Sequence, residues 1–194
     1  NFEGLAIDSR IVKKNNLFLT IRGKKNNGVK FIPNALKKGA KYIVSSKIIK
    51  KYKKKTIRVK NEIKFLNQFE KLKRENSPAK IIAITGSAGK TSLKNLIKQL
   101  LENFADTHSS PRSFNNHFGV PVSISNLSAS DKYGVFEVGM SKPGEIKNLS
   151  KLIQPHFGII TNIGEAHIEN FKNIKGIAKA KSEIIDEIKK NGTI

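Results

Sequence analysis

The chain has 194 residues, with 37 Lys and Arg against 15 Asp and Glu, and it contains no cysteine. Without cysteine it can form neither a disulfide nor a thiolate metal site, and no apolar run approaches the roughly 18–20 residues of a membrane helix. The length suits one domain or two small ones. We expect a cytoplasmic protein without a membrane span, and the first ten residues do not have the pattern of a signal peptide.

The net charge of +22 has two interpretations. A strongly basic chain can bind nucleic acid, but such surfaces favour Arg and interleaved aromatic side chains. Here the excess is almost all Lys, and the densest run, residues 50–55, contains one Tyr. We favour a solvated, lysine-rich surface with no nucleic-acid partner, and binding of a polyanion is the alternative.

Residues 1–77 predict a small α/β domain. Apolar and β-branched runs predict strands at 16–21, 41–45 and 56–59. A helix is expected over 31–39, where Gly39 ends it, and another over 62–75, where apolar residues recur every three positions. The sequence Asn76-Ser77-Pro78 breaks the second helix, and we place the domain boundary there.

Residues 78–194 predict strands that alternate with helices, and this order indicates a parallel sheet with right-handed crossovers. We expect strands at 81–84, 133–138 and 157–163, helices after residue 92 and over 144–153 and 174–190, a short helix-like segment at 120–127, and the start of a further strand at 192–194. The first of these helices has one apolar face, formed by Leu93, Leu96, Ile97, Leu100 and Leu101. The fold class is therefore α/β in both parts.

A turn rich in small residues joins the strand at 81–84 to its helix. It consists of Thr85, Gly86, Ser87, Ala88, Gly89, Lys90, Thr91 and Ser92. Glycines let backbone N–H groups approach an anion, and a helix N-terminus adds partial positive charge, so the turn predicts a cradle for nucleotide phosphates. Lys90 can reach the terminal phosphates, and the Thr91 hydroxyl can bind Mg²⁺. The usual spacing would place glycine at Ile84, so an ordinary strand-to-helix turn is the alternative.

Polar side chains also follow the other predicted strands of this part. Ligands of open α/β sheets gather at the carboxyl ends of the strands. Glu137 ends one strand, where a carboxylate beside a phosphate-binding turn commonly reaches Mg²⁺, and His167 follows another strand, which makes it a candidate functional residue. The alternatives are a structural hydrogen bond for Glu137 and a surface position for His167. Asn115 and Asn116 lie in a polar loop expected over 107–116, where they are either turn residues or ligand contacts.

Several motifs occur together in the second part of the chain. They are the turn at 85–92, FNNHFGVP at 114–121, FEVGMS at 136–141 with Gly144-Glu145-Ile146, TNIGEAH at 161–167 and AKAKSEI at 178–184. In this order they resemble the Mur ligases, and the residues around Met140 and Ala166 resemble the MurF type rather than the MurE type. The resemblance covers nearly the whole chain. It implies a UDP-sugar-binding α/β domain at 1–77, followed at 78–194 by part of a P-loop, parallel-sheet ATP-binding domain.

The resemblance implies an ATP-dependent ligase of peptidoglycan precursor synthesis. Such an enzyme turns the terminal carboxylate of UDP-N-acetylmuramoyl-tripeptide into an acyl phosphate, which the amine of D-alanyl-D-alanine then attacks. ATP and Mg²⁺ are the implied cofactors. The tripeptide precursor and D-alanyl-D-alanine are the implied small-molecule partners, and a monomer is expected.

The resemblance also implies roles for particular residues. The implied catalytic residues are Lys90, His167 and Lys181. The implied magnesium ligands are Thr91, Glu137, His167 and Lys181. Carbamylation would turn Lys181 from a repelling cation into a carboxylate-like ligand. The implied contacts to the uridine diphosphate and sugar part are Ser9, Arg10, Asn115 and Asn116.

Two features depart from the family. MurF enzymes often carry Asp-Gly-His where this chain has Asn27-Gly28-Val29. The chain also starts without Met and ends before the family's remaining central sheet and its third domain, so we expect a fragment that binds nucleotide weakly and does not turn over alone. The alternatives are another ligase of the superfamily, such as the MurE type or a folylpolyglutamate synthase, or a non-catalytic basic P-loop module that binds nucleotide or nucleic acid.

Overall fold

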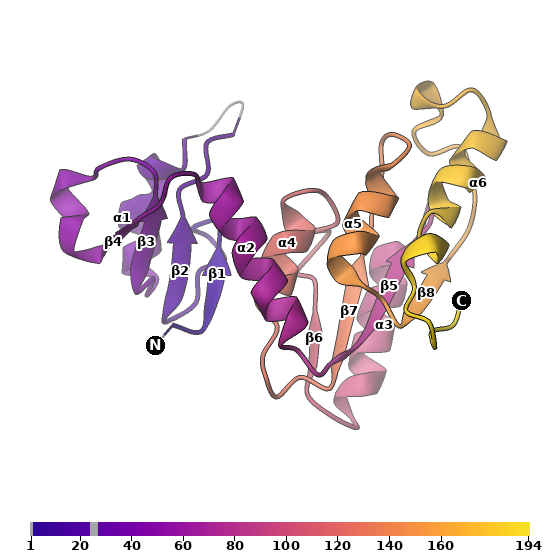
Figure 1. Cartoon of the computed structure of the whole chain (residues 1–194), viewed down its shortest axis with the longest axis horizontal. Helices are drawn as coiled ribbons and strands as arrows, with labels where there is room; N and C mark the ends of the chain where they lie inside the picture. Colours follow the sequence, from indigo (N-terminus) through magenta and orange to yellow (C-terminus); the bar gives the residue numbers. More distant parts are fainter. Residues whose placement is uncertain (1, 24–26) are drawn as a thin grey trace. The chain divides into compact units, whose positions relative to one another are not determined.

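The computed structural model describes residues 2–23 and 27–194. The chain divides into two compact units, Asn1–Leu72 and Lys73–Ile194. Each unit has its own four-stranded parallel sheet (Figure 1). The division falls inside helix α2 (Glu62–Glu75), whereas the sequence placed the boundary just after this helix.

The first unit is built on a sheet with the strand order β1-β2-β3-β4. Its strands are β1 (Gly4–Ala6), β2 (Asn16–Leu19), β3 (Tyr42–Ser45) and β4 (Thr56–Arg58), and its helical segments are η1 (Gly28–Phe31), α1 (Ile32–Lys37) and η2 (Lys50–Lys55). Gly39 has φ +101°, so it ends α1 as predicted. The short strand β1 was not predicted, because three residues carry no readable period.

The second unit is built on a sheet with the order β6-β7-β5-β8. Its strands are β5 (Lys80–Thr85), β6 (Thr107–Ser109), β7 (Tyr133–Glu137) and β8 (Phe157–Ile160), and all neighbours pair in parallel. The predicted parallel sheet is confirmed. β6 lies in the segment that the sequence assigned to a polar loop, because its residues, Thr-His-Ser, resemble a loop in composition.

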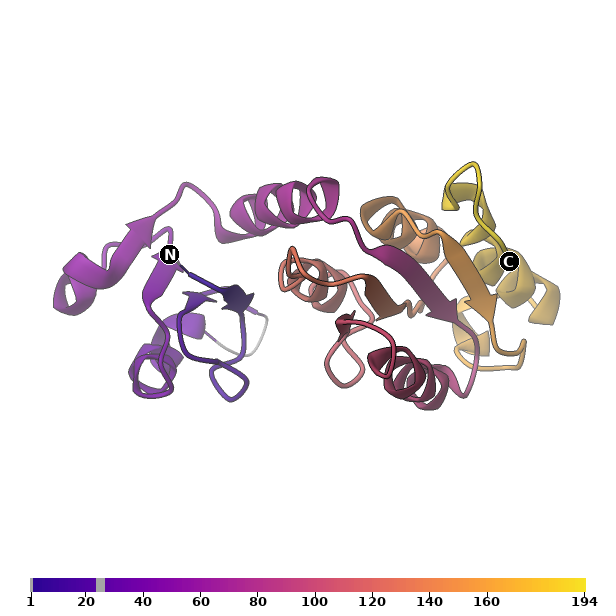
Figure 2. The same ribbon diagram turned by 90° about the horizontal axis from the view of Figure 1, so that it is seen from below.

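Helices cover both faces of the second sheet (Figure 2). Helix α3 (Lys90–Glu102) packs against β6 and β7 on one face, while α5 (Glu145–Ile153) lies on the other. Helix α4 (Gly119–Ile124) contacts α5 and β7, and α6 (Ile174–Ser182) contacts α5. Fifteen buried apolar residues of β5 and β7, of α4, α5 and α6 and of the segments adjoining them form the core, among them Ile81, Phe136 and Ile146.

The apolar residues of α3 are less buried than their spacing suggests. Leu96 and Leu100 are 53% and 54% exposed, whereas Lys94 on the same helix is 1% exposed. The helix rests on β6 and β7 through the side that carries Lys94. The hydrophobic period therefore predicted the buried face only in part: Leu93, Ile97 and Leu101 are partly buried, whereas Leu96 and Leu100 are exposed.

Two elements at the end of the chain are shorter than expected. The predicted helix over 174–190 ends at Ser182, and the strand predicted over 157–163 ends at Ile160. After α6 the chain turns back to β8, where Thr193 forms a parallel bridge with Phe157. The Ile188 side chain occupies the space that a side chain at position 158 would need, and residue 158 is glycine. The strand start predicted at 192–194 is thus present as a single bridge. Among the described residues, no helix combines the length and apolar character needed to cross a membrane.

Candidate functional site

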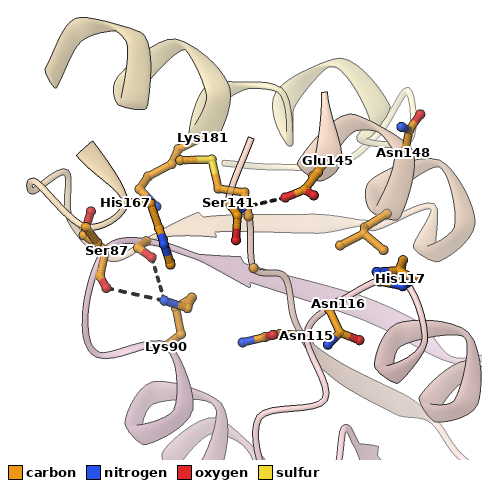
Figure 3. A pocket seen from close by; sticks show the side chains of 15 residues that line it. Ser87, Lys90, Asn115, Asn116, His117, Ser141, Glu145, Asn148, His167 and Lys181 are labelled. Carbon is orange, nitrogen blue, oxygen red and sulfur yellow. Dashed lines mark hydrogen bonds between the residues drawn. The ribbon is translucent and has the colours of Figure 1, made fainter. Parts of the chain in front are cut away.

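A cavity of about 480 Å³ lies within the second unit, beyond the carboxyl ends of its strands (Figure 3). Its walls come from the segments that follow β5, β6, β7 and β8 and from α5 and α6. The predicted site residues that line it are Gly86, Ser87, Lys90, Asn115, Asn116, His167 and Lys181. Ligands of open parallel sheets bind at this edge.

Backbone geometry explains the two glycines of the turn. Gly86 has φ +149°, and a Cβ there would lie 1.8 Å from Thr161 Oγ1. Gly89 has φ +79° and directly precedes α3. A side chain is excluded at the first position and strained at the second. The turn therefore brings the first amides of α3, which have no partner within the helix, to the edge of the cavity.

Lys90 folds back onto its own turn. Its Nζ donates a hydrogen bond to Gly86 O at 2.7 Å and lies 3.5 Å from Ser87 O (Figure 3). A phosphate oxygen is a stronger acceptor for an ammonium than a carbonyl is. An anion in the cavity can therefore draw Lys90 from this position.

The segment after β8 fixes the shape of the turn. Asn162 Oδ1 accepts from Ser87 N at 3.1 Å and from Ala88 N at 2.9 Å. Ser87 Oγ donates to Gly164 O and accepts from Gly164 N, and Thr161 Oγ1 donates to Ala88 O. Sequence reasoning did not single out Asn162, although its place directly after a strand could have indicated it.

Glu137 is the last residue of β7, and its carboxylate is buried beside the start of α3; 1% of its surface is exposed. Thr91 Oγ1 donates to its Oε2 at 2.7 Å, and Asn115 Nδ2 donates to its Oε1 at 2.7 Å. Carboxylate and hydroxyl oxygens are the donors that Mg²⁺ prefers. The Thr91 and Glu137 pair therefore fits a magnesium site, and both were predicted to bind the ion.

His167 and Lys181 lie on the same side of the cavity as Lys90 (Figure 3). His167 is exposed and has φ +63°, and its Nδ1 is 3.8 Å from Glu169 Oε1. Lys181 is 3% exposed, and its Nζ forms no hydrogen bond or ion pair with any described residue. Burial, and then repulsion from Lys90, lowers the pKa of Lys181 to about 8. Among the described residues no group of three or more His, Cys, Asp and Glu could hold a metal, so the fit to Mg²⁺ rests on Thr91 and Glu137.

The two asparagines of the polar loop have different partners. Asn115 holds Glu137 through its side chain and Gly139 through its backbone, since Gly139 N donates to Asn115 O at 2.8 Å. Asn116 Oδ1 accepts from the amides of Phe118 and Gly119 at the start of α4. Both line the cavity, and each also has a structural contact.

Ser9 and Arg10 lie in the first unit. The Ser9 hydroxyl is buried and accepts from Asn34 Nδ2 at 3.0 Å. Arg10 is exposed and forms a two-pronged ion pair with Asp8, which raises the Arg10 pKa. Both side chains are thus ordered within their own unit.

Two domain models of one protein family match the chain. Residues 1–74 match "Mur ligase family, catalytic domain", and residues 84–194 match "Mur ligase middle domain". Curated relatives named UDP-N-acetylmuramoyl-tripeptide–D-alanyl-D-alanine ligase are similar along nearly the whole chain. The protein of Rickettsia prowazekii is 38% identical over 192 residues and that of Buchnera aphidicola is 40% identical over 190, each over 98% of this chain. The chain spans about 42% of the length of these relatives.

Solved structures agree with these relatives. MurF of Acinetobacter baumannii is 33% identical with a TM-score of 0.79, over 97% of this chain and 42% of that one. MurF of Thermotoga maritima, solved in complex with ADP, is 30% identical with a TM-score of 0.77, over 99% of this chain and 45% of that one. Family matches, sequence relatives and structures all point to one group. The chain belongs to the Mur ligase family.

Proposed function

We propose that the chain forms the substrate domain and part of the ATP-binding domain of a MurF-type ligase. Such an enzyme joins D-alanyl-D-alanine to UDP-N-acetylmuramoyl-tripeptide through an acyl phosphate. The observation that carries the proposal is the contact between Thr91 and Glu137 beneath a glycine turn, in a chain whose relatives bear this ligase name. The ADP complex of the Thermotoga maritima neighbour supports nucleotide binding.

The residues of the turn would hold ATP. The amides at the start of α3 and the Lys90 ammonium would bind the phosphates and offset the charge that develops on the transferring phosphoryl group. Asn162 would keep the amides of Ser87 and Ala88 in place, because it already accepts from both. These groups align the phosphoryl group and take no part in covalent chemistry.

Magnesium, when bound, would neutralise phosphate charge during the transfer. Thr91 and Glu137 would hold the ion through their oxygens, and His167 would be a further ligand at the rim of the cavity. Lys181 would take part as a carbamate, which requires its neutral amine. The pKa of about 8 supports this, because a lowered pKa leaves part of the amine neutral near neutral pH.

The remaining assignments follow from the same family. Ser9 and Arg10 would contact the uridine diphosphate, and Asn115 and Asn116 would lie near the nucleotide and sugar substrate. The domain boundary proposed from the sequence separates these two groups at residues 77 and 78. We also propose a cytoplasmic monomer that binds no nucleic acid, because its substrates are small and its excess charge is almost entirely Lys.

The test is substrate-dependent phosphate release from ATP by a protein that carries this chain together with the rest of a ligase. We expect release with UDP-N-acetylmuramoyl-tripeptide plus D-alanyl-D-alanine. Release only with the dipeptide precursor plus a diamino acid would assign the MurE type instead, and release only with folate plus glutamate would assign a folylpolyglutamate synthase. The 194 residues alone should release none, because the relatives are more than twice this length.

The nucleic-acid alternative has a separate test. If this chain retarded the electrophoretic mobility of DNA or RNA at physiological ionic strength, and added salt weakened the effect, a basic binding module would be supported. We expect no such retardation. Replacement of Lys90 by alanine should weaken ATP binding, which a nucleic-acid module would not require.

A further inference from the structure

Lys94 is a buried lysine to which the proposed site assigns no role. It lies on α3 one turn after Lys90, and 1% of its surface is exposed. Its Nζ donates to Ser110 O at 2.8 Å and also to Arg112 O. Burial lowers the pKa of Lys94. Removing an ammonium from water is costly, whereas leucine would fill the space between helix and sheet without that cost, so the charge indicates a role beyond packing.

The two carbonyls belong to one turn. Arg112 has φ +48°, a left-handed conformation that residues other than glycine rarely adopt. The turn leads directly into the loop that carries Asn115 and Asn116. Two hydrogen bonds from one buried ammonium thus fasten the start of this loop to α3.

The same segment holds Glu137 from two sides. Ser110 Oγ accepts from the backbone N of Glu137 at 3.2 Å. Asn115 Nδ2 donates to the Glu137 carboxylate at 2.7 Å, and Asn115 O accepts from Gly139 N at 2.8 Å. The segment from Ser110 to Asn115 therefore fixes both the backbone and the carboxylate of Glu137.

Charge links the same residues. Within the described part of the chain, no Lys, Arg or His forms an ion pair with Glu137. Lys94 is attracted to the Glu137 charge, which partly opposes the effect of burial on the Lys94 pKa. Lys94 thus adds an attractive charge to the surroundings of the buried carboxylate, whose two oxygens accept from Thr91 and Asn115.

We propose that Lys94 is a positioning residue, which holds the segment from Ser110 to Asn115 against α3 so that the Glu137 carboxylate is presented to Thr91 and to the magnesium of a bound nucleotide. The identity of that ligand rests on the proposed function. The restraint on Glu137 does not, because it acts in the free chain. Lys94 acts through Ser110 and Asn115, whereas Lys90 acts on the phosphates directly.

The test compares Lys94→Met with Lys98→Met. Methionine matches the apolar part of the lysine side chain and lacks the ammonium. Lys98 lies one turn further along α3 in an accessible ion pair with Glu102. In the nucleotide-free chain, exchange of the Glu137 and Gly139 amide hydrogens should quicken about tenfold in Lys94→Met. The tightening of ADP binding by Mg²⁺, measured by calorimetry with and without EDTA, should fall about tenfold. Lys98→Met should change neither.

Each outcome decides the proposal. Unchanged exchange at Glu137 and Gly139 would overturn it, and so would weaker ADP binding by the same factor with and without Mg²⁺, since that indicates a general structural role. If the unmodified chain binds no ADP, the proposed function fails for this chain and the exchange measurement alone decides the role of Lys94. Should Lys94→Met not fold, Ser110→Ala breaks the bond to Glu137 N in the same segment. It should quicken exchange at Glu137, and no change there would overturn the proposal.

Discussion

The Thr91 hydroxyl donates a 2.7 Å hydrogen bond to the Glu137 carboxylate across 46 positions of sequence. Strand pairing produces this contact. β5, which leads into the turn before Thr91, pairs in parallel with β7, which ends at Glu137. Adjacent parallel strands end at the same edge, so two oxygen donors from distant segments meet where phosphate and metal would lie.

Replacing Glu137 by glutamine should separate metal binding from folding. Glutamine keeps the shape of the buried side chain and removes its charge; its Oε1 can still accept from Asn115, and its Nε2 can donate to the Thr91 hydroxyl, which now donates to the carboxylate. We expect the melting temperature to change by no more than about 2–4 °C, because removing the charge breaks no ion pair with a described residue. The strengthening of ADP binding by Mg²⁺ should be lost. Calorimetric titration with and without Mg²⁺ measures this, with Glu102→Gln on the exposed face of α3 as control, and a retained magnesium effect would contradict the assignment.

Replacing Lys90 by methionine should weaken phosphate binding. The ammonium now rests on Gly86 O at 2.7 Å and would move to a phosphate oxygen when nucleotide binds. Loss of a charge-assisted hydrogen bond should lower ADP affinity about ten- to a hundredfold. Calorimetry with ADP is the measurement and Lys98→Met is the matched control. Equal affinity of the two variants would show that Lys90 does not reach the phosphates.

Gly86→Ala should destabilise the second unit. The new Cβ would meet Thr161 Oγ1 at 1.8 Å, in a backbone with φ +149°. Steric overlap and backbone strain together should lower the free energy of unfolding by about 2–4 kcal/mol. Denaturant unfolding measures the loss. Gly144→Ala is the control for strain alone, because Gly144 has φ +83° and a Cβ added there would meet no described atom within 4 Å; it should cost about 1–2 kcal/mol. If both variants lost the same free energy of unfolding, the Thr161 side chain would be able to move away from the new Cβ at little cost.

The stability of the chain should depend on pH through His156. Its Nδ1 accepts from Ile81 N at 2.9 Å, which requires the neutral ring. Burial, followed by repulsion from Lys189 and other cations, lowers the pKa of His156 from 6.5 to about 4. Between these values the unfolded chain binds a proton that the folded chain does not, so the free energy of unfolding falls as pH falls from 6.5 towards 4. Above pH 6.5 this contribution is fully present.

His156→Asn provides the comparison for this pH dependence. The asparagine Oδ1 can accept from Ile81 N but does not titrate in this range. Denaturant unfolding at pH 7 and pH 4.5 should show a smaller loss of stability in the variant than in the unmodified chain. An identical loss in both would assign the acid sensitivity to carboxyl groups instead.

Local patterns predicted most of the second unit correctly. Hydrophobic periodicity and turn-forming residues predicted the strand before Gly86, the turn itself and the helix that begins at Lys90. These signals depend only on residues that are adjacent in the sequence. The same holds for α2, whose observed bounds, Glu62–Glu75, are the predicted ones. The edge strands β1 and β6 were missed, because three residues become a strand only when a neighbour supplies the hydrogen bonds.

The candidate site divides in the same way. The sequence by itself determined the glycine turn, the strand-end position of Glu137 and the α/β order, since each depends on a few adjacent residues. Only the tertiary structure decided that Lys94 is buried while Leu96 is exposed, that Asn162 holds the turn, and that Asn115 supports Glu137. These facts depend on which surfaces face one another after the strands pair, and hydrophobic period along one helix contains no information about that pairing.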